Sequence, residues 1–216
     1  NISTYGGNDG YIYISSNGGS GQLTVGWSSD NGFSSSNEDI SNLSAGFYYL
    51  AITDSNSCTS LDTFELSQPT SLWINLDNVI NANCYSYCNG SIDITANGGD
   101  STYSYSWVGP NGFLSNNDDI SNLCYGEYII TINDGITSLV DTFNVYQPQP
   151  ITSTLTADSI LCHNGTAQVE INVWGGTQPF TYNWSNGDNN YFTTFSSGSH
   201  SIIVTDTNGC TFSQSF

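Results

Sequence analysis

Apolar and polar residues alternate along most of this chain with a period of two, and no segment has the 3.6-residue period of an amphipathic helix. Such alternation predicts short strands that each bury one face. One strand follows a Gly-Gly pair in three places and ends at a tryptophan. Its inward positions are Leu23/Val25/Trp27, Tyr103/Tyr105/Trp107 and Phe180/Tyr182/Trp184. The pattern therefore predicts an all-β chain in which similar strands recur.

The recurrence extends beyond that strand. After each tryptophan comes a Leu-x-x-Gly-x-Tyr step, degraded in the third copy, and then an apolar strand that ends at aspartate. The matching residues are Gly18-Gly19, Gly98-Gly99 and Gly175-Gly176; Leu43/Tyr48, Leu123/Tyr128 and Phe195/His200; and Asp54, Asp134 and Asp206. A period of about 80 residues predicts an array of like modules. We expect repeats at residues 1–69, 70–148 and 149–216, the first lacking its beginning and the third its end.

Each repeat is expected to contain strands A, B, C, E, F and G in chain order, joined by turns rich in Gly, Asn and Asp. One inward face per short strand favours a β-sandwich over a small barrel, which is the lesser alternative. A tryptophan on strand C and a tyrosine entering strand F, Tyr48 and Tyr128, fit an immunoglobulin-like order. We therefore expect tandem immunoglobulin-like β-sandwich repeats arranged end to end.

The charge of the chain limits the classes of molecule that it can bind. It has no Lys or Arg and 19 Asp plus Glu, for a formal net charge of −19. Binding to DNA, RNA or an anionic bilayer by charge is excluded, because no cation is available to displace counterions. Divalent cations and neutral glycans stay open as partners. No apolar run reaches membrane-spanning length, and we expect a segment of a longer exported array.

Three segments resemble the SprB-type repeat, which builds very large surface adhesins of gliding and other Bacteroidetes. They are Cys84–Gly90, Gly175–Gly187 and Val204–Cys210. The resemblance implies an immunoglobulin-like module without enzyme activity, exported by type IX secretion. It also implies an extracellular, cell-surface stalk or adhesin used for attachment or gliding, and it names no ligand.

Six cysteines in a chain rich in Asn, Ser, Thr and Gly indicate disulfides and an oxidising compartment. If strand A runs upward, the A–B and E–F turns lie at the top of a repeat and the F–G turn at the bottom. Cys84, Cys88 and Cys162 fall in A–B turns, Cys124 in an E–F turn, and Cys58 and Cys210 in F–G turns. A strand of about seven residues spans roughly 23 Å, whereas disulfide Cα atoms lie within about 7 Å. Cysteines at opposite ends of one repeat should therefore not pair.

The chain enters each repeat at the bottom and leaves at the top, so the F–G turn of one repeat faces the A–B turn of the preceding repeat. This order predicts a Cys84–Cys210 disulfide between the second and third repeats. The same rule would pair positions 4 and 138, which are Thr4 and Ser138, so both thiols are missing together.

The remaining cysteines follow from the same order. Cys88 and Cys124 share the top of the second repeat and should form a local bridge, while Cys58 and Cys162 are left for neighbouring repeats. Two alternatives stay open: a Cys162–Cys210 bridge within the third repeat, and a zinc site of Cys84, Cys88 and His163.

Two corresponding loops carry paired acids, which suit calcium because this hard cation takes oxygen ligands. The candidate ligands are Asp30, Glu38, Asp39, Asp118 and Asp119. The alternative is a solvated loop in which the acids form turns.

Two further side chains are candidates for function, and a third is interpreted as structural. Trp174 stands outside the recurring tryptophan column, so its indole is a candidate for stacking on a sugar ring or for packing between repeats. Asp158-Ser159-Ile160 resembles the O-glycan acceptor of exported Bacteroidetes proteins, which makes Ser159 a glycosylation candidate. His200 replaces a corner tyrosine and is interpreted as structural.

Two hypotheses of function follow. The first is a non-enzymatic stalk or filament segment of a large secreted adhesin whose partners are adjacent repeats, with stiff Gln-Pro joints at Gln68-Pro69 and Gln147-Pro148. The second is a glycan-binding module of a surface protein. No spacing indicates a Ser-His-Asp site, and no cofactor other than calcium is expected.

Overall fold

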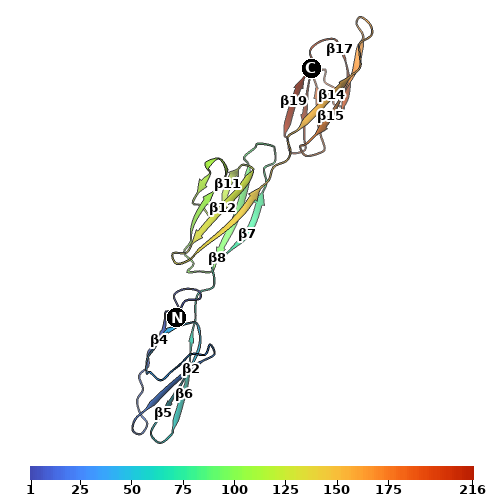
Figure 1. Cartoon of the computed structure of the whole chain (residues 1–216). Coiled ribbons are helices and arrows are strands. Elements are labelled where there is room, and N and C mark those ends of the chain that lie inside the picture. The colour runs from blue at the N-terminus through green and yellow to red at the C-terminus, as the bar shows by residue number, and fades with distance from the viewer. The chain divides into compact units, whose positions relative to one another are not determined.

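The computed structural model describes residues 1–216 as an all-β chain of nineteen strands with one short 3-10 segment, η1 (Pro110–Gly112) (Figure 1). The chain divides into two compact units. Unit 1 comprises Asn1–Asn75, Ala96–Ser104 and Ile132–Leu139, and unit 2 comprises Leu76–Thr95, Tyr105–Thr131 and Val140–Phe216. The second predicted repeat contributes residues to both units, and the repeat boundaries after residues 69 and 148 stay predictions.

The first repeat contains a two-stranded sheet and a four-stranded sheet. The first sheet pairs β1 (Gly10–Ile12) with β4 (Ile40–Leu43), and the second has the order β3 (Ser34–Ser35), β2 (Thr24–Ser29), β5 (Gly46–Thr53), β6 (Thr59–Leu66). Their inward side chains form one core. It includes Ile12, Ile40 and Leu43 from one sheet and Trp27, Tyr48, Leu50 and Leu66 from the other. The alternation of apolar residues thus supplies one buried face to each sheet.

The second repeat adds a third strand to the smaller sheet. One sheet has the order β11 (Ile120–Leu123), β8 (Gly90–Asn97), β7 (Trp73–Ile80). The other has the order β10 (Leu114–Ser115), β9 (Ser104–Val108), β12 (Gly126–Asn133), β13 (Ser138–Val145). The residues that alternate in sequence are fully buried: Ile92, Trp107, Tyr128, Ile130, Ile132 and Val145 are all at most 1% exposed.

The third repeat contains two three-stranded sheets, with orders β14 (Thr152–Ala157), β15 (Thr166–Trp174), β17 (Phe192–Ser196), and β16 (Thr181–Trp184), β18 (Ser201–Thr205), β19 (Thr211–Ser215). Strands β14 and β15 lie side by side and pair antiparallel along their length (Figure 1). The core contains Val169, Ile171 and Phe195 from one sheet and Trp184, Ile202 and Val204 from the other.

The strand order is immunoglobulin-like: the second and third repeats have strands A, B and E in one sheet and C, F and G in the other, and the first repeat has B and E facing C, F and G. The buried tryptophan of strand C is held in the same way each time: the indole Nε1 of Trp27, Trp107 and Trp184 donates to a backbone carbonyl at 3.1, 3.0 and 2.8 Å. The predicted all-β, immunoglobulin-like fold is confirmed.

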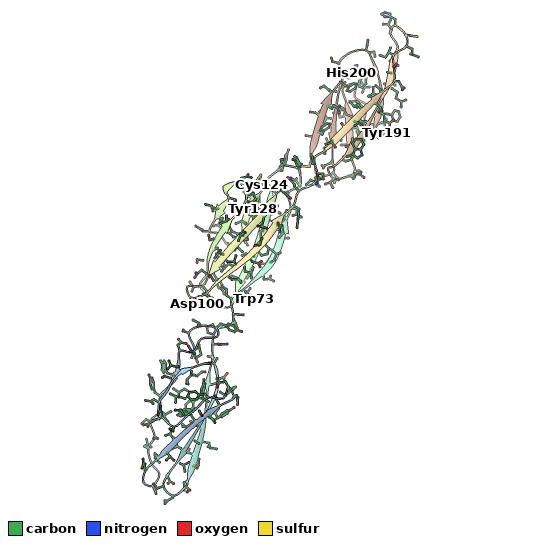
Figure 2. All side chains as sticks on the ribbon, in the orientation of Figure 1. Trp73, Asp100, Cys124, Tyr128, Tyr191 and His200 are labelled. Carbon is green, nitrogen blue, oxygen red and sulfur yellow. A yellow bond between two sulfur atoms is a disulfide. The ribbon has the colours of Figure 1, made fainter.

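The predicted corner tyrosines have the expected hydrogen bond. The hydroxyl of Tyr48 donates to Ser44 O at 2.9 Å, and that of Tyr128 donates to Cys124 O at 3.0 Å (Figure 2). His200 preserves the contact, since its Nε2 lies 2.9 Å from Ser196 O. Burial raises the pKa of the Tyr128 phenol. The E–F corner is therefore fixed by one side chain in each repeat.

Candidate functional site: the turns that connect the repeats

Each F–G turn is organised by the aspartate that ends strand F. The carboxylate Oδ1 of Asp54 accepts the backbone N–H groups of Asn56 and Cys58, both at 2.9 Å. Asp206 Oδ1 accepts those of Asn208 and Cys210, again at 2.9 Å. Asp134 Oδ1 accepts those of Ile136 and Thr137 at 3.0 and 2.6 Å. One carboxylate therefore satisfies the N–H groups of a tight turn in all three repeats.

The same aspartate also holds the Gly-Gly turn between strands B and C. Asp54 Oδ2 accepts the N–H of Ser20 at 3.0 Å, and Asp206 Oδ2 accepts that of Thr177 at 2.9 Å. Backbone N–H donors, first that of Cys58 and then that of Ser20, hold the pKa of Asp54 below its ordinary value. The N–H of Thr137 is the largest influence that lowers the pKa of Asp134. These hydrogen bonds favour the charged carboxylate.

The Gln-Pro linkers are held at both ends by hydrogen bonds. Gln68 Oε1 accepts the N–H of Gly6 at 2.8 Å, and Gln147 Oε1 accepts that of Ser86 at 2.7 Å, so each glutamine ties its linker to an A–B turn. At the other end the N–H of a Gly-Gly turn donates to the linker, Gly99 to Thr70 O and Gly176 to Gln149 O, each at 2.9 Å. The recurring Gln-Pro therefore has a structural reason beyond the stiffness of proline.

In unit 2, which contains Cys84 and Cys210, these two cysteines form a disulfide with Cα atoms 5.6 Å apart. Beside it, Asn208 Nδ2 donates to Asn83 O at 3.1 Å and to Thr177 Oγ1 at 3.0 Å. We call this region the second junction; it comprises Asn83–Tyr87, Pro148–Ile151, Gly176 and Asp206–Cys210. An A–B turn, a linker and an F–G turn meet there.

Unit 1 contains the corresponding region without a cross-link. The first junction comprises Ser3–Tyr5, Pro69–Leu72, Gly99–Asp100 and Asp134–Thr137, which line one small cavity. Sequence spacing placed Ser138 opposite Thr4, and this was wrong by one position. The N–H of Asp134 donates to Thr137 O, whereas those of Asp54 and Asp206 donate to the carbonyls of Cys58 and Cys210. The turn of the second repeat is one residue shorter, so Thr137 takes the cysteine position.

The second disulfide is local. Cys88 in the A–B turn is bonded to Cys124 in the E–F turn of the same repeat, with Cα atoms 3.8 Å apart. Because Tyr128 also bonds to Cys124 O, this corner is fixed twice (Figure 2). Both alternatives for the cysteines disagree with the structure: Cys210 is bonded to Cys84 and not to Cys162, and the sulfurs that a zinc site with His163 requires are oxidised.

Cys58 and Cys162 are free and exposed. Their positions match those of the bonded pair. Cys58 lies where Cys210 lies in the F–G turn, as the shared aspartate contacts show. Cys162 O accepts the N–H of Gly165 at 2.9 Å, and Cys84 O accepts that of Tyr87 at 3.2 Å, so both cysteines begin the same kind of tight turn.

The acidic loops predicted for calcium have protein partners. Asp30 accepts the Tyr49 hydroxyl at 3.1 Å, which raises the pKa of that phenol, and Asp119 accepts the N–H of Ile94 at 2.9 Å. Asp39 accepts the N–H of Ile14, Glu38 accepts that of Ser16, and Asp118 accepts that of Asp119. The structure does not gather three His, Cys, Asp or Glu side chains as a metal site. The calcium site stays a prediction.

The two surface candidates lie in the third repeat. Trp174 at the end of β15 is 53% exposed, and Ser159 is exposed in the loop between β14 and β15. Sequence reasoning missed the roles of Asp54, Asp206 and Asn208. The signal was present, because the segments Asp54-Ser-Asn-Ser-Cys58 and Asp206-Thr-Asn-Gly-Cys210 share Asp, Asn and Cys at equal spacing.

Comparison with solved structures finds chains of several domains at low identity. Three N-terminal domains of the outer capsid protein Hoc of bacteriophage RB49 share 11% identity, with 89% of this chain and 86% of that chain covered and a TM-score of 0.46. The titin fragment I67–I69 shares 10% identity, covering 97% and 91%, with a TM-score of 0.41. Domains 3–5 of Drosophila OTK share 11% identity, covering 91% and 84%, with a TM-score of 0.33.

Three further findings follow. None of the helical structure in the chain has the length and apolar character needed to cross a membrane. No curated protein matches the chain. Residues 154–189, which run from β14 through strand C of the third repeat, match the SprB repeat, and the resemblance inferred from the sequence is thus confirmed for that segment.

Proposed function

We propose that this chain is a non-enzymatic segment of the stalk of a large secreted cell-surface adhesin, used for attachment or gliding. The observation that carries the proposal is the Cys84–Cys210 disulfide, which bonds the A–B turn of one repeat to the F–G turn of the next. A covalent bond at that place restrains the motion of two repeats against each other. Such a restraint suits a structural segment.

The linkers add support to this proposal. The side chain of Gln147 and the carbonyl of Gln149 each accept a backbone N–H, so the linker Gln147–Pro150 is fixed at both ends. Its two prolines lack N–H groups and have restricted φ. A linker held in this way limits bending at the second junction. The SprB match supports a place on the cell surface and export by the type IX pathway.

Force spectroscopy tests the structural role. The chain is held by its two ends under oxidising conditions and stretched. A stalk segment gives separate unfolding events, and the residues between Cys84 and Cys210 do not extend. In the Cys84→Ser/Cys210→Ser chain these residues extend after their repeats unfold, apart from those enclosed by the Cys88–Cys124 disulfide. A chain that extends without force-bearing events, as a flexible linker does, rejects the proposal.

A glycan-binding role is the second candidate, favoured by one observation. Trp174 exposes half of its indole at the end of a strand, where an aromatic face can stack on a sugar ring. A glycan array with the native chain and Trp174→Ala tests this role. Trp73→Ala is the matched control, because Trp73 is 49% exposed and also lies at a strand end. Equal signals from the native chain and both variants reject glycan contact at Trp174.

A further inference from the structure

The F–G end of the first repeat has the parts of a junction without a partner. Strand β1 pairs only with β4, whereas β8 and β15 each have a second neighbour, β7 and β14. At this F–G end lies a hollow of about 420 Å³, lined by Gly18, Gly19, Asp54 and Cys58 among others. The equivalent residues of the other repeats, Gly99 with Asp134 and Gly176 with Asp206, border the two junctions.

The glycines show what occupies this place elsewhere. A Cβ atom added to Gly98 would lie 2.0 Å from Ser71 O, and one added to Gly175 would lie 2.0 Å from Pro150 O. At Gly18 a Cβ atom would meet nothing within 4 Å. The hollow beside Cys58 therefore corresponds to the path of the linker in the second and third repeats.

Cys58 has the setting of a cysteine that is bonded in this same structure. Its N–H donates to Asp54 Oδ1, as that of Cys210 does to Asp206 Oδ1. Asn56 precedes Cys58 by two residues, as Asn208 precedes Cys210, and Asn208 bonds to the partner turn. The F–G turn of the first repeat thus repeats the half of the second junction that Cys210 supplies.

We propose that this end of the first repeat receives the A–B turn of another repeat of the same kind, whose cysteine forms a disulfide with Cys58. The partner cysteine is the first residue of its tight turn, as Cys84 and Cys162 are. This inference deepens the proposed function. It rests on that function in one respect, namely that the partner is another repeat of the same kind. In this chain, Cys162 of a second copy is a cysteine of that kind.

Bond formation is a thiol–disulfide exchange. The thiolate of Cys58 attacks the partner sulfur, which is held in a mixed disulfide with a small thiol. The new S–S bond forms as the old one breaks, and the small thiolate leaves with the electron pair. The co-reactant is therefore the disulfide of the small thiol. One small thiolate leaves when the partner cysteine forms the mixed disulfide and the second leaves when Cys58 attacks, so the oxidant takes up the two electrons of the two cysteines over both steps.

The test uses two variants of the 216-residue chain. The first is the Cys58→Ser variant, whose Cys162 is labelled with thionitrobenzoate. The second is the Cys162→Ser variant, which supplies the free thiol of Cys58. Release of thionitrobenzoate, followed by its absorbance, gives the exchange rate. Salt is added because two chains of net charge −19 repel each other at low ionic strength. The homotypic reaction, in which free Cys162 attacks labelled Cys162, is run in parallel.

We expect the Cys58–Cys162 reaction to be at least about tenfold faster than the homotypic one, and Asn56→Ala to slow only the former. Mass spectrometry of non-reduced peptides should show Cys58 joined to Cys162 with Cys84–Cys210 intact. Equal rates for the Cys58–Cys162 and the homotypic reactions overturn the proposal, whatever the effect of Asn56→Ala. Force spectroscopy does not depend on Cys58, so the failure of this inference and of the stalk function are distinguishable.

Discussion

The first and second junctions share the hydrogen bonds that hold their linkers and differ at a few other side chains. In both, a glutamine Oε1 accepts an N–H of the A–B turn, and a linker carbonyl accepts an N–H of the Gly-Gly turn. Only the second adds a disulfide and the bond from Asn208 to Asn83 O. The comparison shows that the hydrogen bonds of the linker do not require the cross-link. The disulfide is an addition to a junction that backbone geometry already specifies.

The difference comes from a few positions. The first junction has Thr4 where the second has Cys84, and Thr137 where the second has Cys210. It has Ile136, half exposed, at the position of Asn208, since each is the second residue after the aspartate and donates its N–H to that carboxylate. The two cysteines and the asparagine are absent together. This indicates that they act as one set.

The largest effect is expected from removing the cross-link of the second junction. Cys84→Ser/Cys210→Ser opens a disulfide with a sequence separation of 126, which in the chain-entropy model lowers the free energy of unfolding by about 4–5 kcal/mol. Urea denaturation followed by tryptophan fluorescence measures it.

The local disulfide provides the control for that experiment. Cys88→Ser/Cys124→Ser opens a separation of 36, for which the same model gives about 3–4 kcal/mol. If opening the shorter loop costs more than opening the longer one, loop entropy does not explain what the cross-link contributes.

A cross-link built into the first junction should come next in size. Thr4→Cys/Thr137→Cys places thiols at the positions that Cys84 and Cys210 occupy in the second junction. We expect a disulfide to form on oxidation and to stabilise the chain by about 2–4 kcal/mol. Thr4→Cys/Ser138→Cys is the matched control, displaced by one residue. Efficient bonding of the control and none at position 137 would contradict the alignment of the two turns.

Much of the fold follows from the sequence, because burial and turn chemistry repeat with the chain. Trp107 and Tyr128 are buried as the alternation predicts, and the strand order brings Cys84 to Cys210. The register of the turn at Asp134 did not follow. A deletion of one residue inside a turn leaves the strands in phase on either side of it, so spacing alone placed Ser138 where Thr137 lies.

The site was less predictable than the fold, for a related reason. The aspartates were visible as strand ends, but their roles depend on N–H groups from two turns that are distant in sequence, such as Ser20 and Cys58 around Asp54. The role of Asn208 depends on a carbonyl 125 residues away. Contacts of this kind become visible only when the strand ends are placed in space.

Lowering the pH should change the stability of the chain less than removing or adding a disulfide does. The folded pKa values of Asp54 and Asp134 are lowered by backbone N–H groups, so each carboxylate contributes stability that is fully present above its unfolded pKa of about 3.9. That contribution is lost as pH falls through the lower, folded pKa. Melting temperatures should therefore drop below about pH 4.

A variant at one of these aspartates, compared with a control elsewhere, sharpens this experiment. Asp134→Asn should melt at a lower temperature at neutral pH and lose less stability on acidification, because asparagine keeps an acceptor oxygen without the charge. Glu65→Gln, at an exposed position of β6, is the control and should keep the native pH profile. An unchanged acid profile in Asp134→Asn would show that this carboxylate does not carry the pH dependence.

The smallest effect isolates the hydrogen bond that distinguishes the two junctions once the disulfide is in place. Asn208→Ala removes the amide that donates to Asn83 O and Thr177 Oγ1, and should lower the free energy of unfolding by about 0.5–1.5 kcal/mol. Asn56→Ala changes the same turn position in the first repeat, where the chain offers no partner turn, and is the matched control in the urea experiment. Both variants keep the Asp cap, because that cap bonds to backbone N–H groups. If Asn208→Ala and Asn56→Ala lower stability equally, the asparagine serves its own turn, and only the disulfide distinguishes the second junction from the first.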